Sequence, residues 1–321
     1  MTRVQVSGAT GAIGRPLVNQ RSETGADATD VPGTMRAARI HEYGDASVIS
    51  LDEVPVPVPG PGEVLIRVAA TSFNPSEVGL RMGLLRDVLG VTLPHTLGWD
   101  VAGTVVIGAG DFAPGDRVIG LIDGAAAEYA IAKAGVLARA PRRIPLTDAA
   151  AVPVAGLTAW QAVFDHARIG PGSRVLINGA GGGVGLFAVQ LAKHAGAHVV
   201  ATAGPRSAAA VRALGADEVV DYTVAPLPGG NDVLINLVAG LPASVTELAG
   251  EFVSITLPIE HPRAVQFVAR NDPGQLAELV ALIDKGVVDV RVDARPLESL
   301  ADLHRAAERG LTRGKITLNV A

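Results

Sequence analysis

One stretch of this 321-residue sequence decides its fold: Val175-Leu176-Ile177-Asn178-Gly179-Ala180-Gly181-Gly182-Gly183-Val184-Gly185. It begins as an apolar run, which is typical of a buried strand, and its glycines lead directly into a helical pattern. A glycine-rich turn between a strand and a helix lets backbone N–H groups approach phosphate oxygens closely. The stretch therefore predicts a nucleotide-binding turn, although a glycine pattern alone is only weakly diagnostic.

The glycine spacing departs from the literal G-x-G-x-x-G fingerprint, because Ala180 stands where the first glycine would be. That position needs only a small residue for a tight turn. Gly182 leaves room for a pyrophosphate, and Gly185 allows the helix to pack closely on the strand. The pattern is thus compatible with a dinucleotide, and the residues expected to contact it here are Ala180, Gly181, Gly182, Gly183, Val184 and Gly185.

The segments on either side of this turn predict two kinds of folded unit. From residue 35 to about 131, short strands separated by Gly and Pro indicate a compact β-rich domain. Beyond Pro145, helices and strands alternate at a spacing that predicts a doubly wound parallel sheet. After a last helix the chain turns extended again at residues 315–320. We expect this tail to rejoin the β-rich domain.

Composition excludes several classes of function. The 27 basic and 32 acidic residues give a formal charge of −5 without long runs of one sign, so no nucleic-acid or membrane-surface footprint is visible. No apolar run approaches the roughly 20 residues that span a bilayer, and no signal-peptide pattern opens the chain, so the expected location is the cytoplasm. The absence of cysteine excludes disulfides, thiol nucleophiles, iron–sulfur clusters and thiolate zinc sites, and we expect no metal.

A second glycine turn occurs near the N-terminus, at Gly8-Ala9-Thr10-Gly11-Ala12-Ile13-Gly14. With the short strand pattern before it, this turn resembles the opening of a short-chain dehydrogenase. From residue 20 to 34 the pattern dissolves into polar and small residues, so the unit lacks the partner strands of a nucleotide-binding half. We expect residues 1–34 to be a leader without a cofactor, and a docked extra strand and helix is the alternative. A bifunctional fusion would also need the Tyr-x-x-x-Lys pair of short-chain enzymes.

Residues 35–321 resemble the medium-chain dehydrogenase/reductase superfamily, and within it the zinc-free quinone oxidoreductase and enone or enoyl reductase branch. The motifs that carry the resemblance are Gly62-Glu63-Val64-Leu65-Ile66-Arg67-Val68, Asn74-Pro75, Leu97-Gly98-Trp99-Asp100-Val101-Ala102-Gly103, Pro114-Gly115-Asp116-Arg117-Val118, Ala127-Glu128-Tyr129, Gly156-Leu157-Thr158-Ala159, Ala180-Gly181-Gly182-Gly183-Val184-Gly185, Leu214-Gly215-Ala216-Asp217 and Gly314-Lys315-Ile316. They occur in family order and spacing.

The resemblance implies an α/β fold made of two domains. A GroES-like, β-rich catalytic domain would comprise residues 35–154 and 287–321, and a Rossmann domain with a doubly wound parallel sheet would comprise residues 155–286. Substrate would lie between them. Metal-dependent relatives carry a Gly-His-Glu motif, which is replaced here by Gly98-Trp99-Asp100. The resemblance therefore implies hydride chemistry without zinc.

The choice of cofactor is expected to show after the second strand of the nucleotide-binding sheet. An NAD site usually has an acidic residue there for the ribose 2′-hydroxyl, but no Asp or Glu occurs between Leu186 and Ala216. This region instead contains the cation of Arg206 and the hydroxyl groups of Thr202 and Ser207. The Arg206 guanidinium can pair with a 2′-phosphate. We therefore expect NADPH, with contacts from Thr202, Arg206 and Ser207. Tyr222 resembles a family position that contacts the phosphate or the adenosine.

Several further candidates follow from the resemblance. Asn74 would lie beside the nicotinamide and the substrate, where its uncharged amide can orient a carbonyl group; a turn-forming Asn is the alternative. His95 and Tyr129 are candidate catalytic groups, with packing roles as their alternatives. The remaining expected cofactor contacts, at strand ends, at a helix start and in the C-terminal motif, are Thr158, Leu237, Thr256, Leu257 and Lys315.

The sequence as a whole predicts an NADPH-dependent, zinc-independent reductase that passes hydride to a small-molecule acceptor. A quinone and an α,β-unsaturated carbonyl compound are close competitors for that acceptor. An NADPH-binding sensor or partner subunit with little or no turnover is the alternative. The resemblance also implies a homodimer, formed through edge strands of the nucleotide-binding sheet.

Overall fold

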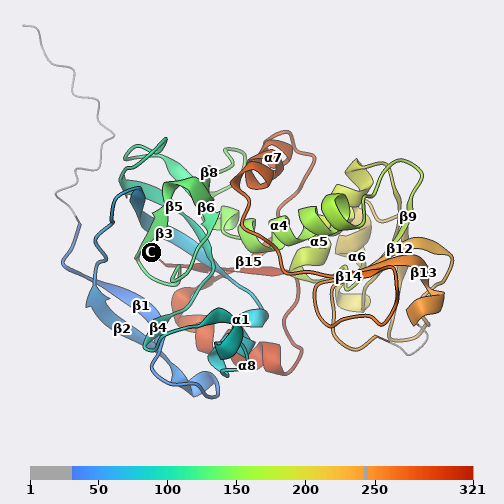
Figure 1. Cartoon of the computed structure of the whole chain (residues 1–321), viewed down its shortest axis with the longest axis horizontal. Coiled ribbons are helices and arrows are strands. Elements are labelled where there is room, and N and C mark those ends of the chain that lie inside the picture. Colours follow the sequence, from blue (N-terminus) through green and yellow to red (C-terminus); the bar gives the residue numbers. More distant parts are fainter. Residues whose placement is uncertain (1–30, 242–244, 321) are drawn as a thin grey trace, which may run out of the picture.

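The computed structural model describes residues 31–241 and 245–320, so the predicted leader lies almost entirely outside the described residues. Figure 1 shows two lobes side by side. One is β-rich and contains the early strands together with the C-terminal strands, and the other is an α/β lobe formed by the middle of the chain. This arrangement confirms the predicted fold class.

The α/β lobe is built on six parallel strands in the order β11-β10-β9-β12-β13-β14. The strands are β9 (Arg174–Asn178), β10 (His198–Thr202), β11 (Glu218–Val220), β12 (Asn231–Asn236), β13 (Ala249–Ser254) and β14 (Ala264–Gln266). The strand order reverses between β9 and β12. Ligands of doubly wound sheets bind at the carboxyl ends of the strands at such a switch point.

Four helices accompany this sheet, namely α4 (Pro153–Trp160), α5 (Gly183–His194), α6 (Pro205–Ala213) and α7 (Pro273–Asp284). Helix α5 packs on β9 and β10, α6 packs on β11, and α4 lies between α5 and α7. A π-helical turn (Gln161–His166) extends α4, and a short 3-10 turn covers Val245–Glu247. Within residues 31–241 and 245–320, no helix has the length and apolarity needed to cross a membrane.

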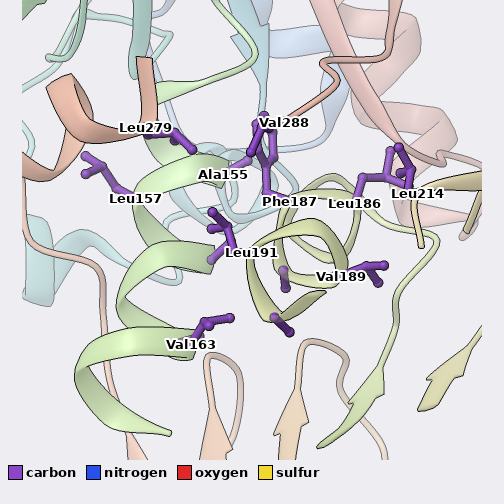
Figure 2. Packing of buried hydrophobic residues seen from close by; sticks show 14 of the residues in the cluster. Ala155, Leu157, Val163, Leu186, Phe187, Val189, Leu191, Leu214, Leu279 and Val288 are labelled. Atoms are coloured by element: carbon purple, nitrogen blue, oxygen red, sulfur yellow. The ribbon is translucent and has the colours of Figure 1, made fainter. Parts of the chain in front are cut away.

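The main core of the α/β lobe forms where these helices meet. Leu157 from α4, Leu191 from α5 and Leu279 from α7 are fully buried in one cluster, which Figure 2 shows. Gly156 makes the close approach of α4 and α7 possible, because a Cβ there would collide with the Leu279 side chain. Side-chain burial of this kind contributes about 1.5–3 kcal/mol per large residue and fixes α5 on the sheet.

The β-rich lobe contains a seven-stranded sheet and a three-stranded sheet. The larger one comprises β3 (Glu63–Phe73), β5 (Asp100–Ile107), β6 (Arg117–Leu121), β7 (Tyr129–Lys133), β8 (Leu137–Arg139), β15 (Val292–Pro296) and β16 (Lys315–Asn319). The smaller one comprises β1 (Thr34–Ile40), β2 (Ile49–Pro55) and β4 (His95–Thr96). The helices and 3-10 turns of this lobe are α1 (Ser76–Arg81), α2 (Arg86–Leu89), α3 (Leu146–Ala149), α8 (Leu300–Glu308), Ala46–Val48, Ala134–Val136 and Leu297–Ser299.

The C-terminal tail returns to the β-rich lobe, as its extended pattern indicated. Strand β16 pairs antiparallel with β3, and Ile316 lies opposite Phe73. Strand β15 joins the other edge of β16 in a parallel pairing. The start of β16 is thereby brought next to the end of β3, which positions the candidate site.

Candidate active site

A cluster of buried polar side chains lies where β3 ends and β5 and β16 begin. We call it the polar cluster; its members, each at most 5% exposed, are Ser72, Asn74, Glu77, Asp100 and Lys315. Asp100 begins β5 and Lys315 begins β16, and both strands pair antiparallel with β3. The antiparallel pairing therefore gathers residues that are more than 200 positions apart in the sequence.

The side-chain amide of Asn74 lies at the centre of the polar cluster. Its Nδ2 donates to Asp100 Oδ2 at 2.9 Å and to Glu77 Oε1 at 3.1 Å. Its Oδ1 accepts from Lys315 Nζ at 2.6 Å. These three bonds fix the orientation of the amide, and Asn74 and Lys315 are two predicted site residues that the structure brings together.

The ammonium group of Lys315 is paired entirely within the protein. Besides its bond to Asn74, Nζ donates to Asp100 Oδ2 at 3.3 Å and to the Phe73 carbonyl oxygen at 3.4 Å. The side chain of Lys315 is 4% exposed and that of Asp100 is fully buried. A buried ion pair of this kind is retained only with additional hydrogen bonds, which Asn74 supplies here.

The carboxylate of Asp100 connects the two lobes. Its Oδ1 accepts from the backbone N–H of Val154 at 2.6 Å, in the first turn of α4. Its Oδ2 accepts from Asn74, Lys315 and the Ser72 hydroxyl. A negative charge at a helix N-terminus is stabilised by the helix dipole, so Asp100 is held from both sides.

The polar cluster contains two carboxyl groups and one ammonium group. Burial, together with the neighbouring charge of Asp100, raises the pKa of Glu77 from its ordinary value of 4.5 to about 7, although the hydrogen bond from Asn74 and the charge of Lys315 act to lower it. Below about pH 7, Glu77 therefore holds a proton and the cluster is electrically neutral. Above that pH the cluster carries one negative charge.

The predicted glycine turn joins β9 to α5 at the switch point of the parallel sheet. Gly179 has a φ of +91°, which favours glycine. A Cβ on Gly185 would come within 2.5 Å of Ala180 Cα, so a glycine is needed for the helix to pack. A Cβ on Gly182 would meet only the Gly179 carbonyl oxygen, at 3.4 Å, so the turn is open there. An open turn ahead of the 12-residue helix α5 fits a pyrophosphate.

The glycine turn and the polar cluster adjoin each other. The backbone N–H of Gly314 donates to the Gly181 carbonyl oxygen at 3.1 Å, and Gly314 forms a parallel bridge with Gly182. A Cβ on Gly183 would lie 3.2 Å from Cδ of Lys315. One side chain, Lys315, thus touches the turn with its stem and Asn74 with its ammonium group.

Three of the residues predicted to contact the adenosine gather beyond the other side of the turn. Arg206 is exposed in the first turn of α6, directly after β10. The neighbouring Ser207 hydroxyl lies so close to Gly181 that a Cβ there would collide with it. The phenol of Tyr222 lies over Gly204, because a Cβ there would be 3.5 Å from its oxygen. Arg206, Ser207 and Tyr222 thus provide a cation, a hydroxyl and a half-exposed ring, which are groups suited to the adenosine part of a cofactor.

A ladder of side-chain hydrogen bonds crosses the carboxyl ends of β10, β9 and β12. The Thr202 hydroxyl donates to Asn178 Oδ1 at 2.8 Å, and Asn178 Nδ2 donates to Asn236 Oδ1 at 2.9 Å. Asn236 Nδ2 donates in turn to Thr256 Oγ1 at 3.2 Å. The Thr202 hydroxyl also accepts from the Gly179 N–H at 2.9 Å. Thr202 therefore helps to fix the backbone of the glycine turn at Gly179.

The other predicted contacts lie around these elements. The Thr158 hydroxyl donates to the Val154 carbonyl oxygen at 2.6 Å, one turn along α4 from the bond to Asp100. Leu237 follows β12, and its N–H donates to the Asn178 carbonyl oxygen at 3.0 Å. Leu257 follows β13 and is 63% exposed. Both leucines thus occupy loops at the carboxyl ends of strands of the parallel sheet.

His95 and Tyr129 lie apart from the polar cluster. His95 is buried 3.4 Å from Asp123, and burial lowers the pKa of its imidazole. The Tyr129 hydroxyl accepts from Arg67 Nε at 3.3 Å. Tyr129 and Asp123 line a groove of about 380 Å³ beside β1 and β2. Within the described part of the chain, no hydrogen bond joins His95 or Tyr129 to Asn74, so their catalytic roles stay predictions.

Tyr129 and Lys133 have the Tyr-x-x-x-Lys spacing that a bifunctional fusion would require. Both residues lie in strand β7, where four residues extend about 13 Å at roughly 3.3 Å per residue. The two side chains therefore cannot act on one atom as a catalytic pair. The glycine turn at residues 8–14 lies outside the described residues.

In the part of the chain that the structure describes, the residues do not fit a zinc site. A catalytic zinc needs three protein ligands from Cys, His or carboxylate groups, and the chain has no cysteine. Residues 31–241 and 245–320 contain no group of three or more His, Asp and Glu side chains that could hold a metal ion. His194 and His198 have the spacing of a ligand pair, but one ends α5 and the other begins β10.

Sequence reasoning did not assign five residues that organise the site, namely Ser72, Glu77, Asp100, Asn178 and Asn236. In the sequence, Asp100 stands out only as part of the motif that replaces Gly-His-Glu. A carboxyl group at the start of a buried strand must be hydrogen-bonded or paired with a cation, and that requirement was the available signal. Asn178 and Asn236 each end an apolar strand of the parallel sheet. Polar residues at the ends of adjacent parallel strands are the signal that would have predicted their contact.

Known protein families match both the β-rich lobe and the α/β lobe of this chain. Residues 60–142 match the alcohol dehydrogenase GroES-like domain family, and residues 214–318 match the zinc-binding dehydrogenase family. The chloroplast envelope quinone oxidoreductase homolog of Arabidopsis thaliana is 33% identical over 320 residues, covering 88% of this chain and 97% of that protein.

Solved structures of the same kind superpose on most of the chain. The quinone oxidoreductase from Coxiella burnetii has a TM-score of 0.82 at 28% identity, covering 90% of this chain and all of that one. Mycobacterial Rv1454c, solved in complex with NADPH, has a TM-score of 0.78 at 27% identity, covering 89% of this chain and all of that one. The chain therefore belongs to the medium-chain dehydrogenase/reductase superfamily, in the quinone oxidoreductase branch of these NAD(P)H-binding oxidoreductases.

Proposed function

We propose that this protein is an NADPH-dependent, zinc-independent reductase of quinones or α,β-unsaturated carbonyl compounds. The observation that supports this most strongly is the contact between the glycine turn and the polar cluster through Gly314 and Lys315. It joins a phosphate-binding turn to a buried, oriented amide and a cation. This is the combination that reduction of a carbonyl-bearing acceptor requires.

The residues that would hold the cofactor follow from the same geometry. The glycine turn and the first N–H groups of α5 would bind the pyrophosphate. Arg206, Ser207 and Tyr222 would bind the adenosine and its 2′-phosphate. The absence of Asp and Glu between Leu186 and Ala216 supports NADPH, because an acid there would repel that phosphate. The loops after β12 and β13 would bind the nicotinamide ribose and the carboxamide.

The bound nicotinamide supplies the hydride. Asn74 and Lys315 would orient the acceptor and stabilise the negative charge that develops on its oxygen. Every donor of these two groups is paired in the polar cluster, so a bond to the acceptor must replace an existing one. The long contacts are the replaceable ones: Lys315 to the Phe73 carbonyl at 3.4 Å, and Asn74 to the Ser72 carbonyl at 3.5 Å.

The reaction also consumes a proton. A quinone takes up one hydride and one proton to become a hydroquinone, whereas an enone takes hydride at its β-carbon and a proton at its α-carbon. Glu77 holds a proton below about pH 7 within the polar cluster. It is therefore a candidate proton source, with water as the other.

The preference for NADPH rests on Arg206, and a pair of variants on one helix tests it. Arg206 is in the first turn of α6 and Arg212 is in its last turn. We expect Arg206→Ala to lower kcat/KM for NADPH at least about tenfold and to leave kcat/KM for NADH within about twofold, because a charge-assisted pair contributes about 1.5–3 kcal/mol. Arg212→Ala is the matched control and should change neither value. Equal losses for both cofactors in Arg206→Ala would contradict the assignment of the 2′-phosphate site.

A further inference from the structure

A hydrogen bond between the two lobes ends on the strand residue that faces Asp100. Asn271 lies in the loop between β14 and α7, and its Nδ2 donates to the Leu121 carbonyl oxygen at 2.7 Å. Leu121 is the last residue of β6, where it pairs with Asp100, the first residue of β5. Residues paired in this way have Cα atoms about 5 Å apart. Asn271 therefore contacts the immediate neighbour of a member of the polar cluster.

The loop that carries Asn271 starts at the carboxyl end of the parallel sheet. It follows β14, whose carboxyl end lies on the same edge as those of β9, β12 and β13, because these strands are parallel. Ligands of doubly wound sheets bind at this edge. The loop then leads into α7, which contacts β8 of the β-rich lobe (Figure 1). Asn271 thus links the edge at which the nicotinamide would bind to the strand pair that holds Asp100.

The backbone on both sides of Asn271 is held by side-chain hydrogen bonds. The amide of Gln161, a residue that is 1% exposed, donates to the Arg270 carbonyl oxygen at 2.9 Å and accepts from the Arg270 N–H at 3.0 Å. The Arg270 guanidinium pairs with Asp165 at 2.7 Å. On the other side, the Asp272 carboxylate accepts from a backbone N–H in the first turn of α7. The α/β lobe therefore fixes the position from which Asn271 reaches the β-rich lobe.

Helix α4 binds the same strand pair from another direction. Its Val154 N–H donates to Asp100 Oδ1 at 2.6 Å, and the turn that extends it begins at Gln161, which holds the loop of Asn271. The α/β lobe thus reaches two opposed strand residues, Asp100 and Leu121, from two separate elements. One hydrogen bond between two rigid bodies lets them rotate about it, whereas a second bond on another element restricts that rotation. Asn271 supplies the second bond at this strand pair.

The stability of the fold alone does not favour an asparagine at position 271. Within residues 31–241 and 245–320, the Asn271 Oδ1 is buried and has no hydrogen-bond partner. A buried amide oxygen without a partner lowers stability, and an apolar side chain of the same size avoids that loss. The amide nitrogen, in contrast, is bonded across the lobes. The donated bond is therefore what an asparagine provides at this position and a leucine does not.

We propose that Asn271 is a positioning residue for hydride transfer. Its bond to Leu121 keeps the carboxyl-end edge of the parallel sheet aligned, through Asp100, with the Asn74 amide, so that the nicotinamide and the acceptor meet at the reacting distance. This inference rests on the proposed function and assigns a residue outside the expected cofactor and acceptor contacts. A displacement of about 1 Å between reacting groups can reduce a rate about hundredfold. Loss of the bond is therefore expected to slow the transfer and to leave cofactor binding intact.

A second asparagine provides a matched control. Asn231 Nδ2 also donates to backbone carbonyl oxygens, at 2.8 and 3.0 Å, and its Oδ1 likewise has no partner among the described residues, but both bonds lie within the α/β lobe. We would measure single-turnover oxidation of NADPH by 1,4-benzoquinone and by 2-cyclohexen-1-one, and the dissociation constant of NADPH. We expect Asn271→Leu to slow the transfer at least about tenfold with an NADPH dissociation constant within about twofold of wild type, and Asn231→Leu to change neither value by more than about twofold. Equal slowing in the two variants, or an unchanged rate in Asn271→Leu, would overturn the proposal.

A distance between the lobes tests the same role without turnover. The chain has no cysteine, so two introduced cysteines can be spin-labelled selectively. Ala213 is exposed at the end of α6, and the Asp302 side chain is 79% exposed on α8, so the pair places one label in each lobe. In the Ala213→Cys/Asp302→Cys protein with NADP⁺ bound, we expect Asn271→Leu to broaden or shift the distribution of label distances and Asn231→Leu to leave it unchanged. Asn271→Ala, which removes the amide without adding a branched side chain, should behave as Asn271→Leu does.

The rate and the distance separate this inference from the proposed function. If the wild-type protein oxidises no NADPH with either acceptor, the proposed function is contradicted, and the distance alone decides whether Asn271 fixes the lobes. If the wild-type protein turns over and both Asn271 variants keep its rate and its distance, the reductase stands and this inference is refuted. Slower transfer with an unchanged distance would also refute it, because alignment of the lobes would then not be the cause.

Discussion

At the scale of single residues, the balance of charge in the polar cluster determines how much the cluster contributes to the stability of the fold. Removing Lys315 leaves Asp100 buried without its cation, and a broken buried ion pair costs about 3–5 kcal/mol. We therefore expect Lys315→Met to reduce the free energy of unfolding by about that amount in denaturant titrations. The charge-neutral pair Asp100→Asn/Lys315→Met should recover most of the loss. If the double variant were less stable than Lys315→Met, the ion pair would not be what holds the cluster.

Glu77 predicts a dependence of stability on pH. Its pKa is 4.5 in the unfolded chain and about 7 in the folded protein, so the folded state binds more protons between these values. The stabilisation is fully present below pH 4.5 and is lost as the pH rises through 7, by about 3 kcal/mol in total. The measurement is the unfolding free energy of the wild-type protein relative to Glu77→Gln across pH 4.5–8.

The glutamine variant is also the control for His304. Burial lowers the pKa of His304 to about 3, so that residue destabilises the fold as the pH falls below 6.5. This opposing effect is present in both proteins and cancels in the difference. A difference that stays constant from pH 4.5 to 8 would show that Glu77 holds no proton in the folded state.

At the scale of elements, helix α1 depends on Arg81 for its position. The guanidinium group joins α1 to α8 and to the turn at Gly44, and its partner His304 lies edge-on to Phe73, next to Asn74. A lysine has one donor group and cannot satisfy these partners together. We expect Arg81→Lys to raise KM for the acceptor at least about fivefold and to leave KM for NADPH within about twofold, since the glycine turn belongs to the other lobe.

An exposed arginine on α2 provides the control for that prediction. Arg86 is 64% exposed at its side chain, so Arg86→Lys should change neither KM. A fall in kcat alone for Arg81→Lys would indicate loss of folded protein. An equal rise in the KM values for the acceptor and for NADPH would contradict the prediction, because it would show that Arg81 does not specifically position α1.

Individual elements also show which parts of the fold and of the candidate site could be predicted from the sequence. The strand and turn from Val175 to Gly185 were predictable, because apolar periodicity and glycine spacing are local properties. The pairing of Asn74 with Lys315 could be expected only through family resemblance, since it depends on β16 returning beside β3. The bond between Asp100 and Val154 was not predicted, because contacts between lobes leave no periodic pattern in the chain.

At the scale of the whole molecule, the two lobes meet through the glycine turn, Gly314 and the Asp100–Val154 bond. The cofactor would therefore bind at the junction that also fixes the polar cluster. The homodimer stays a prediction; β11 and β14 are the outer strands of the parallel sheet that are available for it. Sedimentation of the full chain would measure that assembly directly.

Transfer of hydride from NADPH to an acceptor is the central claim, and single-turnover kinetics tests it most directly. The protein would be mixed anaerobically with a quinone or an enone and with NADPH deuterated at C4, on one face and then on the other. The account predicts acceptor-dependent loss of NADPH, one reduced product per cofactor, and slower transfer for one of the two deuterated faces. Saturable NADPH binding without oxidation by either acceptor would contradict it and leave the protein a cofactor-binding sensor.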